Sequence, residues 1–115
     1  MKRDSATLLD IQSAIEKGIA FLDCSTFEAF QNDGKTQSAV LHQLLPLGEA
    51  VKRLSEDFRV LHTKIPWKVI AGMRDRLIHS YDDVDLNEVW KTVRVDLPKL
   101  QNQIDAVIVR ENPSK

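Results

Sequence analysis

Apolar residues recur along most of the chain at spacings of three and four, the repeat of an α-helix that buries one face. The first stripe predicts a helix over residues 5–22, and its members are Leu8, Ile11, Ile15, Ile19 and Leu22. Residues 23–35 are typical of a connection, in which a short turn of helix around Phe27 and Phe30 is expected.

A second stripe predicts a long helix that is opened by Gly34 and by Thr36 as its capping residue. The alternation of threes and fours is typical of long helices that pack antiparallel. Pro46 falls inside the stripe, and because proline has no amide hydrogen we expect it to kink the helix or split it just before that point. The members of the stripe are Leu44, Leu47, Val51, Leu54, Phe58 and Leu61.

Two more helices are predicted in the second half of the chain. The third begins at Pro66, since proline costs least in the first turn, and it ends near Ser80. A polar connection follows, after which Asp85 and Glu88 form a capping box for the fourth helix. A kink is expected at Pro98. The stripe of the fourth helix consists of Leu86, Trp90, Val93, Leu97, Leu100, Ile104 and Val107.

Four main helices with short connections predict an all-α protein, built as an antiparallel four-helix bundle. The 115 residues have room for one domain, with an ordered core from about residue 5 to about residue 110. Gly18, Gly48 and Gly72 fall inside predicted helices, where glycine costs about 1 kcal/mol relative to alanine. We therefore expect each of these glycines to permit a close helix crossing.

The net charge of −1 argues against broad, non-specific coating of nucleic acid, which needs a strongly basic surface. Any contact with nucleic acid must then be local. The segment from Lys64 to Ser80 qualifies, because its four basic residues and one aspartate give it a charge of +3.

Several other classes of protein find little support in the sequence. The first residues lack the apolar run of a secretory signal, and no stretch is long enough to span a membrane. The single Cys24 is expected to be a small buried apolar group in a reducing cytoplasm. The spacing of Cys24, His42 and His62 fits no metal-ligand motif, so we expect no metal or other cofactor, and both histidines should be structural or exposed.

The segment with Arg74, His79 and Tyr81 carries residue types that suit work on a phosphodiester. A guanidinium binds phosphate oxygens, an imidazole exchanges protons near neutral pH, and a tyrosine offers a hydroxyl or a stacking ring. At about 100° per residue, Arg74 and Tyr81 share a helix face, whereas Arg74 and His79 lie roughly 140° apart. One straight helix cannot point all three at one target, so either the helix ends before His79 or a second subunit completes the site.

The same residues also have ordinary interpretations. Arg74 could be a surface arginine, His79 a histidine with satisfied hydrogen bonds, and Tyr81 a packing residue with a solvated hydroxyl. Trp67 and Trp90 are expected in the core or at an interface. Spacing alone does not decide between these interpretations and catalysis.

A longer pattern surrounds these residues. Residues 74–81, Arg-Asp-Arg-Leu-Ile-His-Ser-Tyr, resemble the Arg-x4-His-x-Tyr motif of the HepT-like family within the HEPN superfamily. Upstream, Leu-Gly-Glu-Ala at 47–50 resembles the family's Gly-Glu-Ala helix, and the likeness extends from about residue 9 to about residue 104. The flanks also match, with Ile-Pro-Trp at 65–67 and Ala-Gly-Met at 71–73 before the motif, and Val-Asp at 84–85, Val-Trp at 89–90 and Leu-Pro at 97–98 after it.

The resemblance implies a cytoplasmic toxin of a two-component toxin–antitoxin pair. Such a toxin is a homodimeric, metal-independent ribonuclease that cleaves RNA by attack of a 2′-hydroxyl. Its antitoxin would be a minimal nucleotidyltransferase that silences it by binding or by attaching AMP to Tyr81. By the same resemblance, Arg74 binds phosphate and His79 is the acid/base. We expect Asp75 and Arg76, the two residues that follow Arg74, to be supporting residues.

Two residues depart from the family's pattern. Asp75 stands where asparagine is most frequent, and it adds a negative charge near the phosphate site. Pro46 is unusual just before the Gly-Glu-Ala segment. A different class of function also stays open, in which the protein is a catalytically idle helical dimer that acts only as a binding partner or AMP acceptor. RNA cleavage that disappears in His79→Ala would separate the two.

Overall fold

The computed structural model describes residues 2–80 and 83–111, and most of this part of the chain is helical. The predicted all-α class is confirmed, because the strands in these residues form only one small two-stranded sheet. The elements are α1 (Lys2–Leu22), α2 (Phe27–Gln31), α3 (Gly34–Arg53), α4 (Glu56–Leu61), α5 (Trp67–Ala71), α6 (Met73–Leu77), β1 (Ile78–Ser80), β2 (Asp83–Val84), α7 (Leu86–Lys91), the π-helical turn η1 (Thr92–Asp96) and α8 (Leu97–Glu111).

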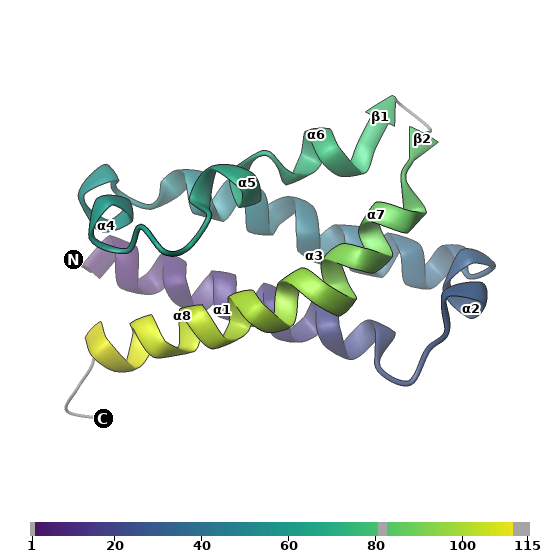
Figure 1. Cartoon of the computed structure of the whole chain (residues 1–115), viewed down its shortest axis with the longest axis horizontal. Helices are drawn as coiled ribbons and strands as arrows, with labels where there is room; N and C mark the ends of the chain where they lie inside the picture. The colour runs from purple at the N-terminus through teal and green to yellow at the C-terminus, as the bar shows by residue number, and fades with distance from the viewer. Residues whose placement is uncertain (1, 81–82, 112–115) are drawn as a thin grey trace.

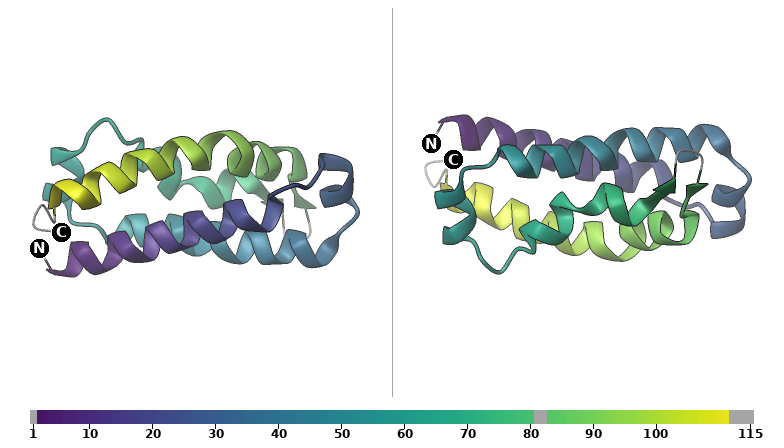
Figure 2. Two further views of the ribbon diagram at one scale, coloured as in Figure 1. Left: turned by 90° about the horizontal axis from the view of Figure 1, so that it is seen from below. Right: turned by 90° about the horizontal axis from the view of Figure 1, so that it is seen from above.

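Successive long segments run in opposite directions along the bundle (Figure 1). α1 packs along α3 on one side and along α8 on the other, and α5 and α6 close the bundle over α3 (Figure 2). The antiparallel bundle is therefore as predicted, except that shorter pieces take the place of the third long helix.

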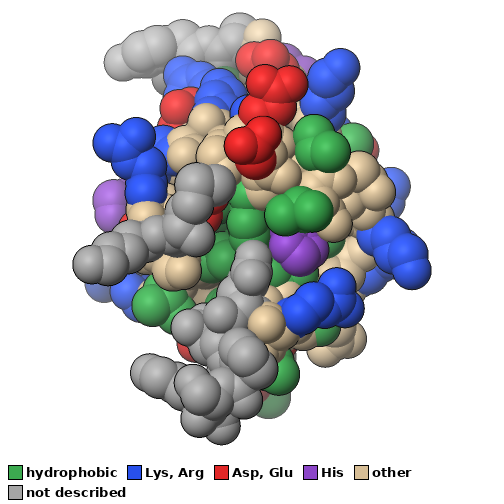
Figure 3. Space-filling model, turned by 90° about the vertical axis from the view of Figure 1, so that its left-hand side faces the viewer, with side chains coloured by type: hydrophobic (Ala, Val, Ile, Leu, Met, Phe, Trp, Pro, Cys, Tyr) green, Lys and Arg blue, Asp and Glu red, His purple; other side chains and the backbone are tan. Residues whose placement is uncertain are grey.

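The apolar stripes meet in one core. Leu61 is an exception among the predicted members: it is 75% exposed, at the end of the bundle where Figure 3 shows apolar side chains at the surface. The chain leaves the α3 helix at Leu54, so one helical face does not continue as far as Leu61. Six residues of the second and fourth stripes are buried as predicted, none more than 5% exposed: Leu44, Leu54, Phe58, Val93, Leu97 and Leu100.

α3 differs from the prediction at its start, and it is not split at Pro46. Its N-cap is Asp33 rather than Thr36, because the Asp33 carboxylate accepts hydrogen bonds from the Thr36 amide at 3.2 Å and from the Thr36 hydroxyl at 2.6 Å. The helix continues through Pro46. Because proline has no amide hydrogen, the carbonyl of His42, four residues before Pro46, has no helical partner. Both residues are exposed, so water can bond to that carbonyl. The break comes later, where Ser55 caps α4.

The predicted third helix is two short helices followed by a hairpin. α6 ends at Leu77, three residues before the predicted end at Ser80. β1 then pairs antiparallel with β2, with Ile78 opposite Val84. The Asp85 amide donates to the Leu77 carbonyl at 2.7 Å, which satisfies that carbonyl from outside the helix and ends α6 there.

Two of the three glycines lie at close helix crossings, as predicted. A Cβ on Gly18 would lie 3.2 Å from Cδ1 of Leu97, and one on Gly48 would lie 3.1 Å from the Ile70 carbonyl oxygen. The prediction for Gly72 is wrong. This residue forms the junction between α5 and α6, and an added Cβ would approach only the preceding turn of α5.

The last long helix is continuous but irregular. Asp85 caps α7 as predicted, since its Oδ1 accepts from the Glu88 amide at 3.1 Å. The Glu88 carboxylate lies 3.9 Å from Arg76, and the Asp85 amide donates to the Leu77 carbonyl instead of to Glu88. Only the first of the two hydrogen bonds of the predicted capping box is therefore formed. At Leu97, just before Pro98, the amide donates to the Thr92 carbonyl five residues back. This π-turn lies just before Pro98, the residue at which a kink is expected.

Residues outside the motif also test the sequence predictions. Cys24 is exposed, with a φ of 65° in the turn after α1, so the prediction of a buried thiol is wrong. Trp67 is in the core, as expected. His42 is exposed, and the His62 ring packs on Phe58 with centroids 4.6 Å apart. None of the described helices combines the length and apolar character that a bilayer crossing needs.

Candidate active site

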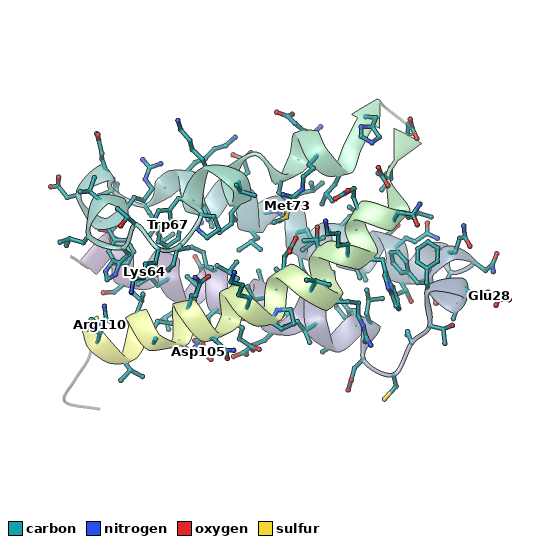
Figure 4. The ribbon with its side chains drawn as sticks, in the orientation of Figure 1. Glu28, Lys64, Trp67, Met73, Asp105 and Arg110 are labelled. Atoms are coloured by element: carbon teal, nitrogen blue, oxygen red, sulfur yellow. The ribbon has the colours of Figure 1, made fainter. Side chains whose placement is uncertain are left out.

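α6 holds the motif arginine on the surface of the bundle. Met73 and Leu77, near its two ends, are buried, and Figure 4 shows Met73 pointing into the bundle. Because residues one and two positions after Met73 must then point elsewhere on the helix, Arg74 and Asp75 face outward, and both are exposed.

Arg74 lines a groove that α6 forms with α1 and α3. The groove has a volume of about 530 Å³, and its other walls come from Asp10 and Ala14 of α1 and from α3 between Leu45 and Arg53. In this groove the Arg53 guanidinium forms an ion pair with the Asp10 carboxylate at 3.8 Å. Arg74 makes no hydrogen bond or ion pair with any residue in the described part of the chain. Its guanidinium is therefore available to a phosphate.

His79 lies on β1, and its imidazole contacts a carboxylate across the hairpin. Its Nε2 is 3.0 Å from Oδ2 of Asp85, the residue at the junction of β2 and α7. The side chain of His79 is 51% exposed and that of Asp85 only 28%, so the histidine presents an open edge while the aspartate is partly covered.

The contact changes the acid–base properties of both groups. The hydrogen bond with Asp85 raises the pKa of His79 above its usual value, against the opposing effect of partial burial, and the charges of Asp85, Asp83 and Glu88 add to the increase. In turn the hydrogen bond with His79 lowers the pKa of Asp85, helped by the amide of Glu88. A larger fraction of His79 is therefore protonated near neutral pH than in an isolated histidine.

Arg76 faces the opposite side of α6 from the groove. Its guanidinium lies 3.4 Å from the Thr92 hydroxyl, 3.7 Å from the Asp96 carboxylate and 3.9 Å from that of Glu88. These contacts connect α6 to α7 and to the π-turn. Asp75, the other predicted supporting residue, is exposed on α6 beside Arg74.

The helix ends before His79, which is the first of the two arrangements expected from the 140° offset. Because β1 is extended, the helical angle no longer relates Arg74 to His79. No contact joins their side chains within the described residues. Tyr81 lies outside those residues, and the helix on which it was expected to share a face with Arg74 ends at Leu77.

Asp85 was missed as a partner of His79 and was predicted only as a helix cap. The spacing in the sequence is compatible with the contact between His79 and Asp85, since a carboxylate six residues after a histidine can face it across a tight hairpin. That reading requires the helix to end at Leu77, which periodicity did not indicate. In the described part of the chain, no group of three His, Cys, Asp or Glu side chains is arranged to hold a metal ion.

Comparison with known proteins places these residues in a family. The model of the family "Ribonuclease HepT-like" matches residues 11–107 of this chain. A protein from Thermococcus cleftensis described as "Probable ribonuclease HepT" is 45% identical over 106 residues, which cover 91% of this chain and 96% of that protein.

Two further relatives are described as "Putative RNase". One, from Caldanaerobacter subterraneus, is 42% identical over 75% of this chain and 77% of its own length. The other, from Methanocaldococcus jannaschii, is 39% identical over 93% of each chain. No solved structure matches the chain. The match to the family model over most of the sequence, together with these relatives, shows that the chain belongs to the HepT-like ribonuclease family of the HEPN superfamily.

Proposed function

We propose that the protein is a metal-independent endoribonuclease and the toxin of a toxin–antitoxin pair. The observation that carries the proposal is that the segment at 74–79 presents both an exposed His79 held by Asp85 and an Arg74 guanidinium with no partner among the described residues. Both belong to one short segment of a HepT-like chain. The substrate is RNA, because the proposed reaction uses the 2′-hydroxyl that DNA lacks.

In this reaction Arg74 contacts the non-bridging oxygens of the phosphate and holds the negative charge that develops there. His79 takes the proton of the neighbouring 2′-hydroxyl, and the 2′ oxygen forms a bond to phosphorus. The bond from phosphorus to the 5′ oxygen breaks, and that oxygen takes up a proton from water. The products are a 2′,3′-cyclic phosphate, which hydrolyses to a 3′-phosphate, and a 5′-hydroxyl.

Silencing by a minimal nucleotidyltransferase belongs to the same proposal. Its target is Tyr81, two residues after His79 in the sequence. AMP attached to Tyr81 would add a phosphate charge close in sequence to His79, and we expect that charge to exclude RNA. Tyr81→Phe should resist silencing by AMP attachment and keep RNase activity. Mass spectrometry of the toxin after co-expression with the nucleotidyltransferase would check this, and an unmodified Tyr81 in a silenced toxin would contradict it.

Digestion of RNA by the purified protein in EDTA tests the central claim. We expect the wild type to cleave and to leave cyclic phosphate or 3′-phosphate ends. His79→Ala should lose activity by about 10²–10⁴, the usual cost of removing an acid/base group. His42→Ala is the matched control, because His42 is also an exposed histidine but lies on α3.

Other results would point elsewhere. Activity that needs a divalent metal would contradict the mechanism. A folded wild type that binds the nucleotidyltransferase but cleaves no RNA would favour the alternative, a helical dimer that serves only as a binding partner or AMP acceptor.

A further inference from the structure

We propose that Asp85 is the positioning residue of His79, holding the imidazole by Nε2 and leaving Nδ1 as the nitrogen that exchanges a proton with RNA. The inference rests on the proposed ribonuclease function for its role, but not for its geometry, which is a contact within the protein.

Asp85 is held at three points. Its amide donates to the Leu77 carbonyl at 2.7 Å, and its Oδ1 accepts from the Glu88 amide at 3.1 Å. Both of these partners are main-chain atoms: the first fixes the backbone of Asp85, and the second holds its carboxylate. The remaining oxygen, Oδ2, lies 3.0 Å from Nε2 of His79. One residue thus ends α6, begins α7 and orients the imidazole.

A second aspartate cap in the same chain shows that this arrangement is not a general consequence of capping. Asp33 begins α3, and its two carboxylate oxygens accept from the amide and the hydroxyl of Thr36, within its own turn. Asp85 instead uses one oxygen for its own turn and the other for a histidine on a different element.

The contact also selects a tautomer. A carboxylate accepts hydrogen bonds, so in the neutral ring the proton sits on Nε2 and the lone pair on Nδ1. When Nδ1 takes the proton of a 2′-hydroxyl, the ring becomes an imidazolium whose Nε2–H still donates to Asp85. The bond from the 2′ oxygen to phosphorus forms and the bond from phosphorus to the 5′ oxygen breaks. Water gives a proton to the leaving 5′ oxygen, and the imidazolium afterwards returns its own proton to water. The aspartate stays ionised throughout.

The charges around His79 act in the same direction. Asp83 on β2 and Glu88 on α7 both favour the imidazolium, and together with Asp85 they raise the pKa of His79. Glu88 is partly neutralised by Arg76, whose Nε lies 3.9 Å from it. Asp85 is the largest contributor, so its removal should lower the pKa of His79 most.

Asp85→Asn tests the role of the carboxylate while keeping a good helix cap, because asparagine caps helices about as well as aspartate. Asp33→Asn makes the same exchange at a cap that faces no histidine, and it serves as the matched control. NMR of the ring nitrogens of His79 reports both its tautomer and its pKa. In the wild type we expect the Nε2–H tautomer. In Asp85→Asn we expect a lower pKa and a shift toward the Nδ1–H tautomer, because the asparagine oxygen stays on the Glu88 amide and its NH2 group donates to Nε2.

RNA cleavage gives the second measurement. Asp85→Asn should lower kcat about 10-fold with little change in KM, less than the loss expected from removing His79 itself. The limb of the pH–rate profile that His79 governs should move to lower pH, and Asp33→Asn should move neither value. An Nδ1–H tautomer in the wild type, or an unchanged His79 pKa and pH profile in Asp85→Asn, would overturn the inference.

These outcomes separate the inference from the proposed function. If His79 shows the expected tautomer and pKa but the wild type cleaves no RNA, the ribonuclease proposal fails and the positioning geometry stands. If the wild type cleaves RNA and Asp85→Asn is indistinguishable from it, the positioning role fails alone. The wild-type tautomer needs no variant, so a misfolded Asp85→Asn would not remove the test.

Discussion

At the scale of single residues, Arg74 and Arg76 are two positions apart on one helix and have different surroundings. Arg74 lines an open groove, whereas Arg76 is spread over a hydroxyl and two carboxylates of α7 and η1. A guanidinium that is already surrounded by protein acceptors has less to offer a phosphate. The structure therefore favours Arg74 for contact with RNA and indicates that Arg76 holds α6 against α7 and η1.

A pair of alanine variants separates these two roles. Arg74→Ala should abolish RNA cleavage and change the free energy of unfolding by less than about 0.5 kcal/mol, as is usual for an exposed side chain. Arg76→Ala should destabilise the fold by about 1 kcal/mol, because its partly screened contacts to three side chains are lost. Urea denaturation measures the stability and RNA digestion the activity. Equal loss of stability in the two variants would contradict the assignment.

The His79–Asp85 contact should also make stability depend on pH. The raised pKa of His79 means that the contact stabilises the fold fully below the unfolded value of about 6.5 and is lost as pH rises through the folded value. The lowered pKa of Asp85 means that its contribution is present above the unfolded value of about 3.9 and is lost as pH falls through the folded one.

Thermal melts of the wild type and His79→Ala over a range of pH test this. The difference in Tm should be largest between about pH 4 and pH 6.5, and it should shrink as pH rises through the raised folded pKa of His79, where the imidazole loses its proton. The effect should be small because His79 is half exposed. A difference in Tm that grows with rising pH would show that the pair does not act in this way.

The residue types at the site were accessible from the sequence, but their partners were not. Arg74 and His79 stand out because guanidinium and imidazole suit phosphodiester chemistry. The sequence correctly predicts Asp85 as a helix cap. Its second contact, with His79, depends on where α6 ends. Arg76 looks equivalent to Arg74 until Glu88, Thr92 and Asp96 are placed around it.

At the scale of elements, the close approach of α3 and α5 depends on Gly48. An added Cβ would lie 3.1 Å from the Ile70 carbonyl oxygen, a main-chain atom that cannot move without shifting α5. Gly48→Ala should therefore destabilise the fold by about 1–3 kcal/mol, the typical cost of overpacking. Gly34→Ala is the control, since a Cβ there meets nothing within 4 Å. That variant should be neutral or up to about 1 kcal/mol more stable.

Chemical denaturation of the two glycine variants measures this difference. Because α5 leads directly into α6, Gly48→Ala should also reduce RNA cleavage, whereas Gly34→Ala should not. Equal stability of the two variants would mean that α5 can move away from α3 without cost.

Helical periodicity identified the helices better than their ends. The buried stripes were predicted because each long helix has one apolar face, and burial follows that face. Breaks were misplaced where local chemistry outweighs the pattern. Pro46 is tolerated on an exposed face, and the actual break follows at Ser55, where the buried Asp4 carboxylate accepts from both the amide and the hydroxyl of Ser55. A contact spanning 51 positions in sequence cannot be read from local spacing.

At the scale of the whole molecule, we expect a two-fold homodimer in which the segment with Gly72 and Arg74 lies near the symmetry axis. The end of α6 at Leu77 removes the angular argument for this arrangement, but Arg74 and His79 still make no contact within one chain. We propose that a copy of the chain packs over the Arg74 groove and that its His79 approaches that guanidinium.

Cross-linking tests the position of the axis. Asp75 is exposed beside Arg74, so Asp75→Cys should give a disulfide-linked dimer if α6 faces its copy. The exposed Cys24 must first be replaced by serine, and Glu16→Cys on the exposed face of α1 serves as the control. A monomer by sedimentation at micromolar concentration would contradict the dimer.

Complementation then tests whether the active site is shared between two subunits. Arg74→Ala and His79→Ala should each be inactive as homodimers. If each site takes Arg74 from one chain and His79 from the other, a heterodimer of the two variants retains one intact site. Such a heterodimer, purified with two different tags, should show about half the wild-type activity because one of its two sites is complete. If both residues of a site come from the same chain, the heterodimer has no intact site and stays inactive. Activity of the heterodimer therefore distinguishes a shared site from two independent ones, with each homodimer as its control.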